Sequence, residues 1–315
     1  MSKSKNNITV GITLGDPTGI GPEVVAKALH QPSIRRLANF VIIGDGIIFQ
    51  RFLKKKYPNL IFEDLRNPFA AKLKSGCPGR PSAQAALSYL NRAIQLIKTK
   101  NIDTLVTAPL SKEYICDLGY NFAGHTEYLA SAFGVKKFGM MFVGPKFRII
   151  IATRHIPLKK VPSAINARNI FETLQLTHQA LKHLFHIPHA AIGVCGLNPH
   201  AGERGRMGEE EKTKIIPAIK KANRLGIRVT GPFAADTLFI MNRYQKFDAI
   251  VAIYHDQGLI PIKTLFFTRL VNLTIGLPFI RTSPAHGTAF DIAGKNKANP
   301  GSMVEAIKLA IDLSR

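Results

Sequence analysis

Short apolar runs alternate with amphipathic helical patterns from one end of this 315-residue chain to the other. This alternation is typical of an α/β protein with a mainly parallel sheet, because each strand returns to the same edge through a helix. Most runs are apolar on both faces, as expected for strands that helices cover on both sides. The predicted strands are Ile8–Leu14, Phe40–Ile43, Thr104–Thr107, Phe147–Thr153, Ala191–Cys195 and Asp248–Ile253.

The length of the chain allows one large domain or two domains of ordinary size. Neither an internal repeat nor a flexible linker interrupts the pattern. We therefore expect a two-lobed α/β/α body with an active-site cleft between the lobes. The first lobe is expected to comprise residues 1–130 and 275–315, with both termini, and the second lobe residues 131–274.

The charge balance is strongly basic, with a formal net charge of +23 and a sequence pI near 10.1. Clustered lysine and arginine would indicate a nucleic-acid-binding protein. Here the basic residues are spread over the whole chain, and the longest run is only Lys54–Lys56. Spread charge is typical of a solvated surface, and it favours small anionic substrates.

The cysteines are three in number and widely spaced, which predicts neither a disulfide framework nor a CxxC zinc or redox site. This use of cysteine favours reducing cytosol. The basic N-terminal stretch leads into a first strand and has no cleavage pattern, so it is not interpreted as a signal peptide. Since no segment approaches the roughly 20 apolar residues of a membrane span, we expect a cytoplasmic protein without a membrane partner.

Histidines follow three of the predicted strands within a few residues: His155, His200 and His255. In open parallel sheets ligands bind at the carboxyl ends of the strands, so these imidazoles meet at one edge if the three strands are neighbours. Three neutral imidazoles can bind a divalent metal and leave one position open. A single histidine in such a loop is usually an ordinary polar residue. Only the shared position of all three indicates a metal site.

Two glycine-containing stretches bear on anion binding. GHTEY places His125 and Thr126 at a predicted helix start, where backbone amides and a hydroxyl can hold an anion, although Thr126 could equally be a simple helix cap. GDPTGIGPE, residues 15–23, links a strand to a helix as a phosphate loop would. It fits neither GxGxxG nor the P-loop pattern, so a Rossmann-type site is not predicted.

Six stretches run in order over nearly the whole length: GDPTGIGPE, TAPLSKE, GHTEYLA, NPHAGE, YHDQGLIPIK and GLPFIRTSPAHGTAFDIAG. Together they resemble the 4-hydroxythreonine-4-phosphate dehydrogenase family of vitamin B6 biosynthesis. HGTAFDIAGKNKANP, residues 286–300, also resembles the segment with which isopropylmalate and isocitrate dehydrogenases bind the adenosine half of their cofactor. The resemblance implies an isopropylmalate dehydrogenase-like fold, and it explains the missing GxGxxG.

The resemblance implies an oxidoreductase that acts on the CH–OH group of 4-phosphooxy-L-threonine. The resulting β-keto acid would lose carbon dioxide and give 3-amino-2-oxopropyl phosphate, on the route to pyridoxal phosphate. NAD or NADP is the implied cofactor, with one divalent ion of zinc, magnesium, manganese or cobalt per site. The implied assembly is a homodimer whose active sites borrow residues across the interface, with the metal histidines and dimer contacts in the second lobe.

The resemblance also assigns residues to roles. The metal ligands would be His155, His200 and His255. The substrate would be bound by His125, Thr126, Lys263, Asn272 and Arg281, of which Lys263 and Arg281 supply charge for the phosphate. The cofactor would be bound by Gly287, Asp291 and Asn299. Asp236 and Asp256 match supporting carboxylates. Ala285 departs from the pattern, since many relatives have Asp there, and no residue is identified as the general base.

Two other functions fit parts of the sequence. A related dehydrogenase of 4-phosphothreonate or 4-phosphoerythronate would use the same phosphate and metal residues. A basic nucleic-acid-binding protein is the alternative from another class, and it rests on the charge alone.

Overall fold

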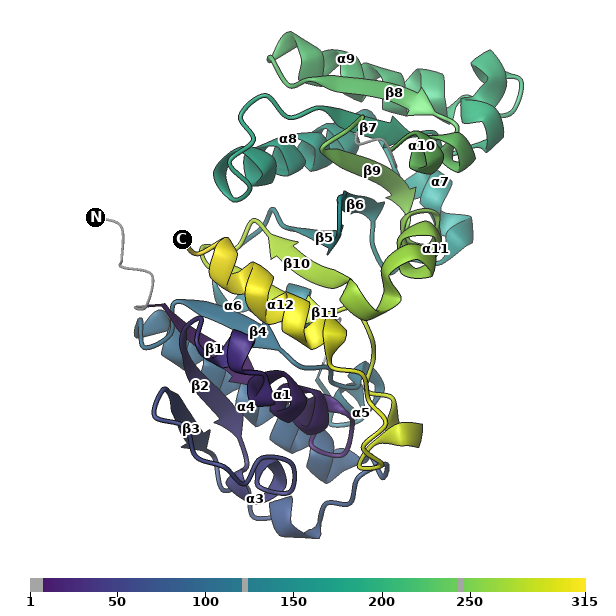
Figure 1. Ribbon diagram of the computed structural model, residues 1–315. Helices are drawn as coiled ribbons and strands as arrows, with labels where there is room; N and C mark the ends of the chain where they lie inside the picture. Colours follow the sequence, from purple (N-terminus) through teal and green to yellow (C-terminus); the bar gives the residue numbers. More distant parts are fainter. Residues whose placement is uncertain (1–7, 121–123, 243–245) are drawn as a thin grey trace. The chain divides into compact units, whose positions relative to one another are not determined.

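The structure is a computed structural model that describes residues 8–120, 124–242 and 246–315. The chain divides into two compact units, each with paired strands and covering helices (Figure 1). Unit 1 comprises residues 1–136, 268–273 and 277–315, and unit 2 comprises residues 137–267 and 274–276.

Unit 1 is built on a parallel sheet with the strand order β3-β2-β1-β4-β11. The strands are β1 (Thr9–Thr13), β2 (Asn39–Gly44), β3 (Leu60–Asp64), β4 (Thr104–Thr107) and β11 (Ile280–Pro284). The helices are α1 (Gly21–His30), α2 (Pro32–Arg35), α3 (Gly46–Phe49), α4 (Arg80–Lys98), α5 (Lys112–Cys116), α6 (His125–Ala132) and α12 (Gly301–Asp312), with the short 3₁₀ turns η1 (Ala70–Lys72) and η6 (Phe290–Ile292).

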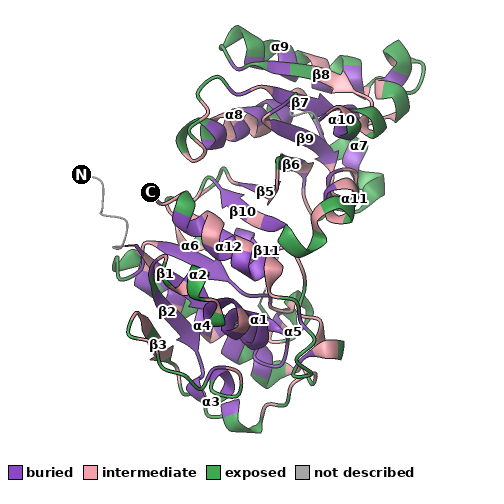
Figure 2. Cartoon of the chain, in the orientation of Figure 1, coloured by how far each residue is buried: buried purple, intermediate pink, exposed green. Residues whose placement is uncertain are grey.

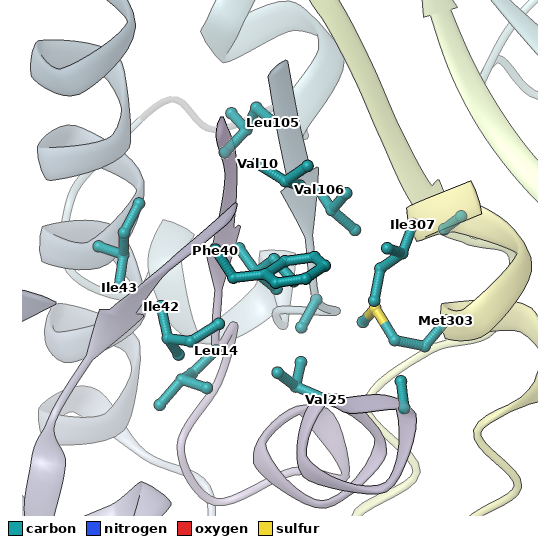
Figure 3. Packing of buried hydrophobic residues seen from close by; sticks show 14 of the residues in the cluster. Val10, Leu14, Val25, Phe40, Ile42, Ile43, Leu105, Val106, Met303 and Ile307 are labelled. Atoms are coloured by element: carbon teal, nitrogen blue, oxygen red, sulfur yellow. The ribbon is translucent and has the colours of Figure 1, made fainter. Parts of the chain in front are cut away.

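The core of unit 1 lies between this sheet and its helices. Figure 3 shows Phe40 of β2, Val106 of β4 and Ile307 of α12 in one cluster, and all three are fully buried. Burying a side chain of this size stabilises the fold by about 1.5–3 kcal/mol. The cluster therefore holds the central strands of unit 1 in place, and the loops that carry candidate site residues extend from the ends of these strands.

Unit 2 has the strand order β5-β6-β9-β7-β8. β5 (Gly139–Gly144) is antiparallel to β6 (Phe147–Thr153). The other pairs are parallel and join β6 to β9 (Ala249–Tyr254), β9 to β7 (Ile192–Cys195) and β7 to β8 (Val229–Phe233). The helices are α7 (Val161–Ala164), α8 (Ala167–His183), α9 (Ile216–Arg224), α10 (Ala235–Asn242) and α11 (His255–Phe266), with the turns η2 (Leu158–Lys160), η3 (Pro199–Gly205), η4 (Glu211–Ile215) and η5 (Phe267–Arg269).

The α/β prediction is confirmed, because the strands form a mixed, mostly parallel arrangement. All six predicted strands are present within one or two residues, and Figure 2 shows most of their length buried. Strands β3, β5, β8, β10 (Val271–Ile275) and β11 were not predicted. Polar residues such as Asn272 and Arg281 interrupt the apolar runs of the last two. Within the described residues, no helix is long and apolar enough to cross a membrane.

The segment 268–273 belongs to unit 1, whereas the sequence predicted it in the second lobe, residues 131–274. The contacts of α12 account for this. Ser302, at the start of α12, donates a hydrogen bond to the carbonyl oxygen of Leu270 (2.5 Å) and accepts one from the backbone of Ala285 (3.0 Å). Strand β10 has its first residues in unit 1 and its last ones in unit 2.

Candidate active site

Two of the three predicted metal histidines lie side by side in unit 2. Thr153 at the end of β6 pairs with Tyr254 at the end of β9, so the chain leaves both strands at the same level. His155 and His255 follow these residues, and their ring centroids are 5.5 Å apart with the planes tilted by 45°. Both histidines line a cavity of about 230 Å³, together with Arg154, Tyr254 and Asp256.

A carboxylate orients the ring of His255. Its Nδ1 lies 2.7 Å from Oδ1 of Asp256, the next residue of α11. A histidine whose Nδ1 is held by a carboxylate presents Nε2 to a further partner, and this arrangement is common among metal-bound histidines. The predicted supporting role of Asp256 is therefore compatible with its position.

His200 lies after β7, in the turn η3, and its side chain is exposed. Its Nδ1 is 2.7 Å from Oε1 of Glu203, and this hydrogen bond raises the pKa of the imidazole above its usual value. The backbone from His200 to Arg204 has positive φ angles, between 42° and 78°. Left-handed conformations of residues other than glycine are strained and are common at functional sites.

A buried carboxylate holds this turn in place. Glu211, at the start of η4, is 3% exposed, and its Oε1 accepts hydrogen bonds from the backbone amides of Leu197 and Asn198, both at 2.8 Å. Its Oε2 accepts another from the side chain of Asn198 at 3.0 Å. A methyl group on Gly202 would clash with the same oxygen. The His200 loop is therefore built around Glu211.

His155, His200 and His255 are the residues predicted to bind a metal ion. In the part of the chain that the structure describes, no group of three or more His, Cys, Asp or Glu side chains is arranged to hold one. The structure thus brings His155 and His255 together, but His200 does not join them in a group of three metal ligands. The chemistry of the two adjacent imidazoles, with a carboxylate on one ring, fits a divalent metal.

A second group of predicted site residues lies in unit 1, around the start of α6. Arg281 on β11 is 1% exposed, and its Nε and Nη2 donate hydrogen bonds to Oγ1 of Thr107, at 3.2 and 2.5 Å. Burial lowers the pKa of Arg281, while the nearby carboxylate of Glu127 raises it. A buried guanidinium is costly unless it meets negative charge, and its planar fork matches two oxygens of a phosphate.

His125 and Thr126 are the first two residues of α6, as predicted, and Thr126 is buried. Burial, together with the cations Arg281 and Lys112, lowers the pKa of His125 well below its usual value. His125 is therefore neutral near pH 7. Backbone amides at a helix start, a hydroxyl and nearby cations together form an environment suited to an anion.

Sequence reasoning missed Lys112, Thr107 and Glu127 as members of this group. A Cβ atom on Gly124 would lie 3.2 Å from Nζ of Lys112 and 3.2 Å from Oε2 of Glu127, so the two charged groups meet at the start of α6. The stretches TAPLSKE and GHTEY contain these residues, and they were the signal that could have found them.

The remaining predicted substrate residues are spread over other elements. Lys263 lies in α11, half-buried. Asn272 lies on β10, and its buried Oδ1 has no hydrogen-bond partner among the described residues, which suits a group that receives its partner from a ligand. Asp236 is in the first turn of α10. Its Oδ1 accepts a hydrogen bond from the backbone amide of Thr237 at 2.8 Å.

The predicted cofactor segment, residues 286–300, is tied to α1 and the turn before it. The amide of Ile20 donates to the carbonyl of Thr288 at 2.9 Å, and Nζ of Lys27 donates to the carbonyl of Ala298, also at 2.9 Å. Glu23 accepts from the amide of Ala298 at 3.0 Å.

The three predicted cofactor residues differ in their surroundings. A methyl group on Gly287 would contact nothing within 4 Å, so packing does not explain the glycine. Asp291 is exposed in η6, and Asn299 accepts a hydrogen bond from the amide of Gly301 at the start of α12 (2.8 Å). This segment is thus an ordered loop that leaves Gly287 and Asp291 accessible.

The fold and these two groups of residues define a class: an α/β protein with a buried arginine near a helix start and with a pair of adjacent histidines whose chemistry suits a divalent metal. The chain belongs to the family described as pyridoxal phosphate biosynthetic protein PdxA, whose profile matches residues 36–310.

Individual relatives match over almost the full length. The chain is 40% identical to a 4-hydroxythreonine-4-phosphate dehydrogenase of Sulfurihydrogenibium sp., covering 98% of this chain and 99% of the relative. It is 41% identical to a D-threonate 4-phosphate dehydrogenase of Cupriavidus necator, covering 97% of each. Among solved structures, the 4-hydroxythreonine-4-phosphate dehydrogenase of Klebsiella pneumoniae matches with a TM-score of 0.86 at 33% identity, over 98% of this chain and all of that one.

The predicted fold class is confirmed by a more distant structure. A β-decarboxylating dehydrogenase of Thermococcus kodakarensis matches with a TM-score of 0.50 at 14% identity, covering 95% of this chain and 81% of that one. At this identity the match concerns the fold alone.

Proposed function

We propose that this chain is a metal-dependent dehydrogenase that oxidises the secondary hydroxyl of 4-phosphooxy-L-threonine. The hydroxyl carbon transfers a hydride to NAD or NADP and the hydroxyl loses a proton, which gives a β-keto acid. The β-keto acid then loses carbon dioxide and leaves 3-amino-2-oxopropyl phosphate. The observation that carries this proposal is the adjacent pair His155 and His255 at the ends of two neighbouring parallel strands.

We assign His155 and His255, with His200 as the third ligand, to the metal. A bound divalent ion supplies Lewis acidity, which polarises the oxygen of the substrate. Asp256 fixes the orientation of the His255 ring through Nδ1, and Glu203 does the same for His200. Asp236 and Asp256 are the carboxylates assigned to support the site.

The phosphate of the substrate is assigned to Arg281 and Thr126 of unit 1, where His125 is neutral beside Arg281. Lys263 of unit 2 is assigned to the phosphate as well, on the resemblance alone. Arg281 offers a bidentate hydrogen-bonding fork, and Lys263 offers a point charge. Lys112 is added to this group because its ammonium lies at the start of α6. Asn272 is assigned to a polar group of the substrate, since its buried Oδ1 has no hydrogen-bond partner in the part of the chain that the structure describes. Binding the phosphate orients the hydroxyl for hydride transfer.

The nicotinamide cofactor is assigned to the segment 286–300, with contacts from Gly287, Asp291 and Asn299. Hydrogen bonds to Ile20, Glu23 and Lys27 hold this segment in place. A preformed loop binds a cofactor without paying much ordering entropy.

The active form is proposed to be a homodimer with shared active sites. The outer faces of α10 and α11 expose large apolar side chains: Ile240 is 61% exposed, Ile260 64% and Leu265 47%. All three line a cavity of about 520 Å³ together with Asp236 and Asp256. Exposed apolar patches of this kind mark protein–protein interfaces, and a second copy of the chain is the partner we assign.

D-Threonate 4-phosphate is the second candidate substrate. The relative from Cupriavidus necator carries that name and is as similar to this chain as the 4-hydroxythreonine-4-phosphate dehydrogenase from Sulfurihydrogenibium is. Both substrates present a phosphate to the same cationic residues, so the two activities require separate assays.

Metal removal tests the proposal. Chelation should abolish NAD reduction, and added divalent metal should restore it. His155→Ala and His255→Ala should each lower the bound metal measured by mass spectrometry, whereas His183→Ala, at the exposed end of α8, should keep it. A fully metal-depleted sample that retains its rate would refute the metal-dependent reaction.

A further inference from the structure

A separate cavity of about 730 Å³ lies in unit 1, at the edge of the sheet. Figure 1 shows its two flanking elements, α3 and β3, side by side, and the segment 50–57 closes the third side. None of the lining residues is among those assigned above to metal, substrate or cofactor. They are Gly46, Phe49, Gln50, Leu53, Lys54, Lys55, Lys56, Tyr57, Leu60, Phe62 and Asp64.

One side of this cavity is aromatic. Phe49 of α3 and Phe62 of β3 stack with ring centroids 5.5 Å apart and an angle of 20° between the planes. Leu60, Phe62 and Asp64 line the cavity because alternate residues of a strand point to the same face. Phe49 is buried, at 3% exposed, whereas Phe62 is half-buried, so Phe62 forms the accessible part of this apolar wall. Such a wall suits a planar ring.

The other side is cationic. Lys54, Lys55 and Lys56 are all exposed, and within the described residues none of them forms an ion pair with a carboxylate. The lining carboxylate, Asp64, is already engaged by the backbone amide of Gly46 at 2.9 Å and by Arg66 at 3.7 Å. The longest basic run in the sequence is thus gathered at one cavity, and nothing in the proposed reaction uses it.

We propose that this cavity binds a small phosphorylated ligand with a planar heterocycle. The ring lies against Phe62, which stacks on the buried Phe49, and the phosphate lies among Lys54, Lys55 and Lys56. The volume is within the range of small-molecule sites, which is about 300–1,000 Å³. A nucleotide and a phosphorylated pyridine share this chemistry, and the test separates them.

Isothermal titration calorimetry of the full chain with ADP and with pyridoxamine 5′-phosphate tests the proposal, with NAD present at saturation so that the cofactor segment 286–300 is already occupied. At least one of them should bind with one site per chain. Adenosine, pyridoxamine and inorganic phosphate should each bind more weakly, because each lacks one half of the recognised chemistry. The variant Lys54→Gln/Lys56→Gln should weaken binding at least about fivefold, since two charge contacts are lost. Tyr57→Leu is a second variant that leaves the lysines in place. It should also weaken binding, because Tyr57 lines the cavity and the substitution removes its ring.

The matched control is Lys182→Gln/Lys220→Gln, which makes the same change in net charge on the exposed surface of unit 2. It should leave the affinity within twofold of that of the unchanged protein. Binding of ADP alone identifies a nucleotide site, and binding of pyridoxamine 5′-phosphate alone identifies a phosphorylated pyridine site. No binding of either, equal losses in the two double variants, or a parallel fivefold loss of NAD affinity in Lys54→Gln/Lys56→Gln would each overturn the proposal.

Discussion

Arg281 combines nearly complete burial with a full positive charge. Its guanidinium contacts a threonine hydroxyl, Oγ1 of Thr107, and the carboxylate of Glu127 acts on it electrostatically. Desolvating a cation costs several kcal/mol, and further negative charge from a ligand offsets that cost. This makes Arg281 the residue on which phosphate binding should depend most.

Arg281→Ala should lower kcat/KM for the phosphorylated substrate by at least ~1.5 kcal/mol, or more than tenfold, because a charge-assisted hydrogen bond is lost. The kcat/KM of Arg281→Lys should lie between those of wild type and Arg281→Ala, since lysine keeps the positive charge and lacks the planar fork of the guanidinium. Steady-state kinetics measure both, and thermal unfolding reports whether the variants remain folded. Arg269→Ala, on an exposed turn, is the control. An unchanged kcat/KM in Arg281→Ala would remove this residue from the site.

His125 predicts a pH dependence of stability. Its pKa is lowered in the folded state by burial, Arg281 and Lys112, so between that pKa and its unfolded value near 6.5 the unfolded chain binds more protons. Folding is therefore penalised as pH falls below about 6.5.

Urea unfolding of wild type and His125→Gln at pH 7.5 and 5.5 should show that the variant loses less stability on acidification. His189→Gln, at an exposed loop position, should behave like wild type. Equal losses in wild type and His125→Gln would mean that His125 is not held neutral.

At the scale of elements, the ends of neighbouring strands place the site residues. The apolar runs of β6, β7 and β9 were readable in the sequence, and so was the position of one histidine after each of them. The pairing of β6 with β9 then explains why His155 and His255 meet.

Other features of the site could not be predicted from local patterns. The left-handed turn at His200 contains Ala201 and Glu203, for which propensity does not predict positive φ. The carboxylate of Glu211 holds that turn through contacts 13 or 14 residues away along the chain. Glu211 is the last of three consecutive glutamates, Glu209–Glu211, and this run by itself indicates only negative charge that suits a helix start. Lys112 was not predicted either, because only the fold places it beside Gly124.

Glu211→Gln should destabilise the protein by about 1.5–3 kcal/mol. The hydrogen bonds that the buried carboxylate accepts are weakened, and the new side-chain NH2 group of the glutamine must face a hydrogen-bond donor, either the side chain of Asn198 or the backbone amides. It should also lower metal affinity through the displaced His200 loop. Urea unfolding and metal titration measure the two effects. Glu209→Gln is the matched exposed control and should change neither. If Glu211→Gln keeps wild-type stability, the carboxylate does not hold the loop.

At the scale of the whole molecule, the apolar surface of α10 and α11 is the assigned dimer contact. Ile260→Glu should place a charge in that contact and convert the dimer to monomers, with loss of activity if the sites are shared. Light scattering after size-exclusion chromatography measures the mass. Leu225→Glu alters an equally exposed apolar residue, 62% exposed, outside this surface, and should leave the dimer intact. A dimeric Ile260→Glu protein would place the interface elsewhere.

Mixed dimers test whether the sites borrow residues from both chains. His255→Ala and Arg281→Ala, each assayed alone for its residual activity, are unfolded and refolded together. Random reassortment makes about half of the dimers mixed, and a mixed dimer has one intact site if the metal and phosphate residues come from different chains, so activity should reach about a quarter of wild type. His155→Ala with His255→Ala should stay inactive, because those rings adjoin in one chain. Inactivity of the first mixture, with wild type surviving the same treatment, would assign each site to one chain.

4-Phosphooxy-L-threonine is the substrate that we propose for this chain, with a nicotinamide cofactor and a divalent metal. The most direct test measures NADH formation and carbon dioxide release from 4-phosphooxy-L-threonine and from D-threonate 4-phosphate in parallel, with metal added. We predict a kcat/KM for 4-phosphooxy-L-threonine at least about tenfold above that for D-threonate 4-phosphate, a difference of about 1.4 kcal/mol in transition-state stabilisation. A reversed preference, or no reduced cofactor from either compound in a metal-loaded, folded sample supplied with NAD and, separately, with NADP, would contradict this proposal.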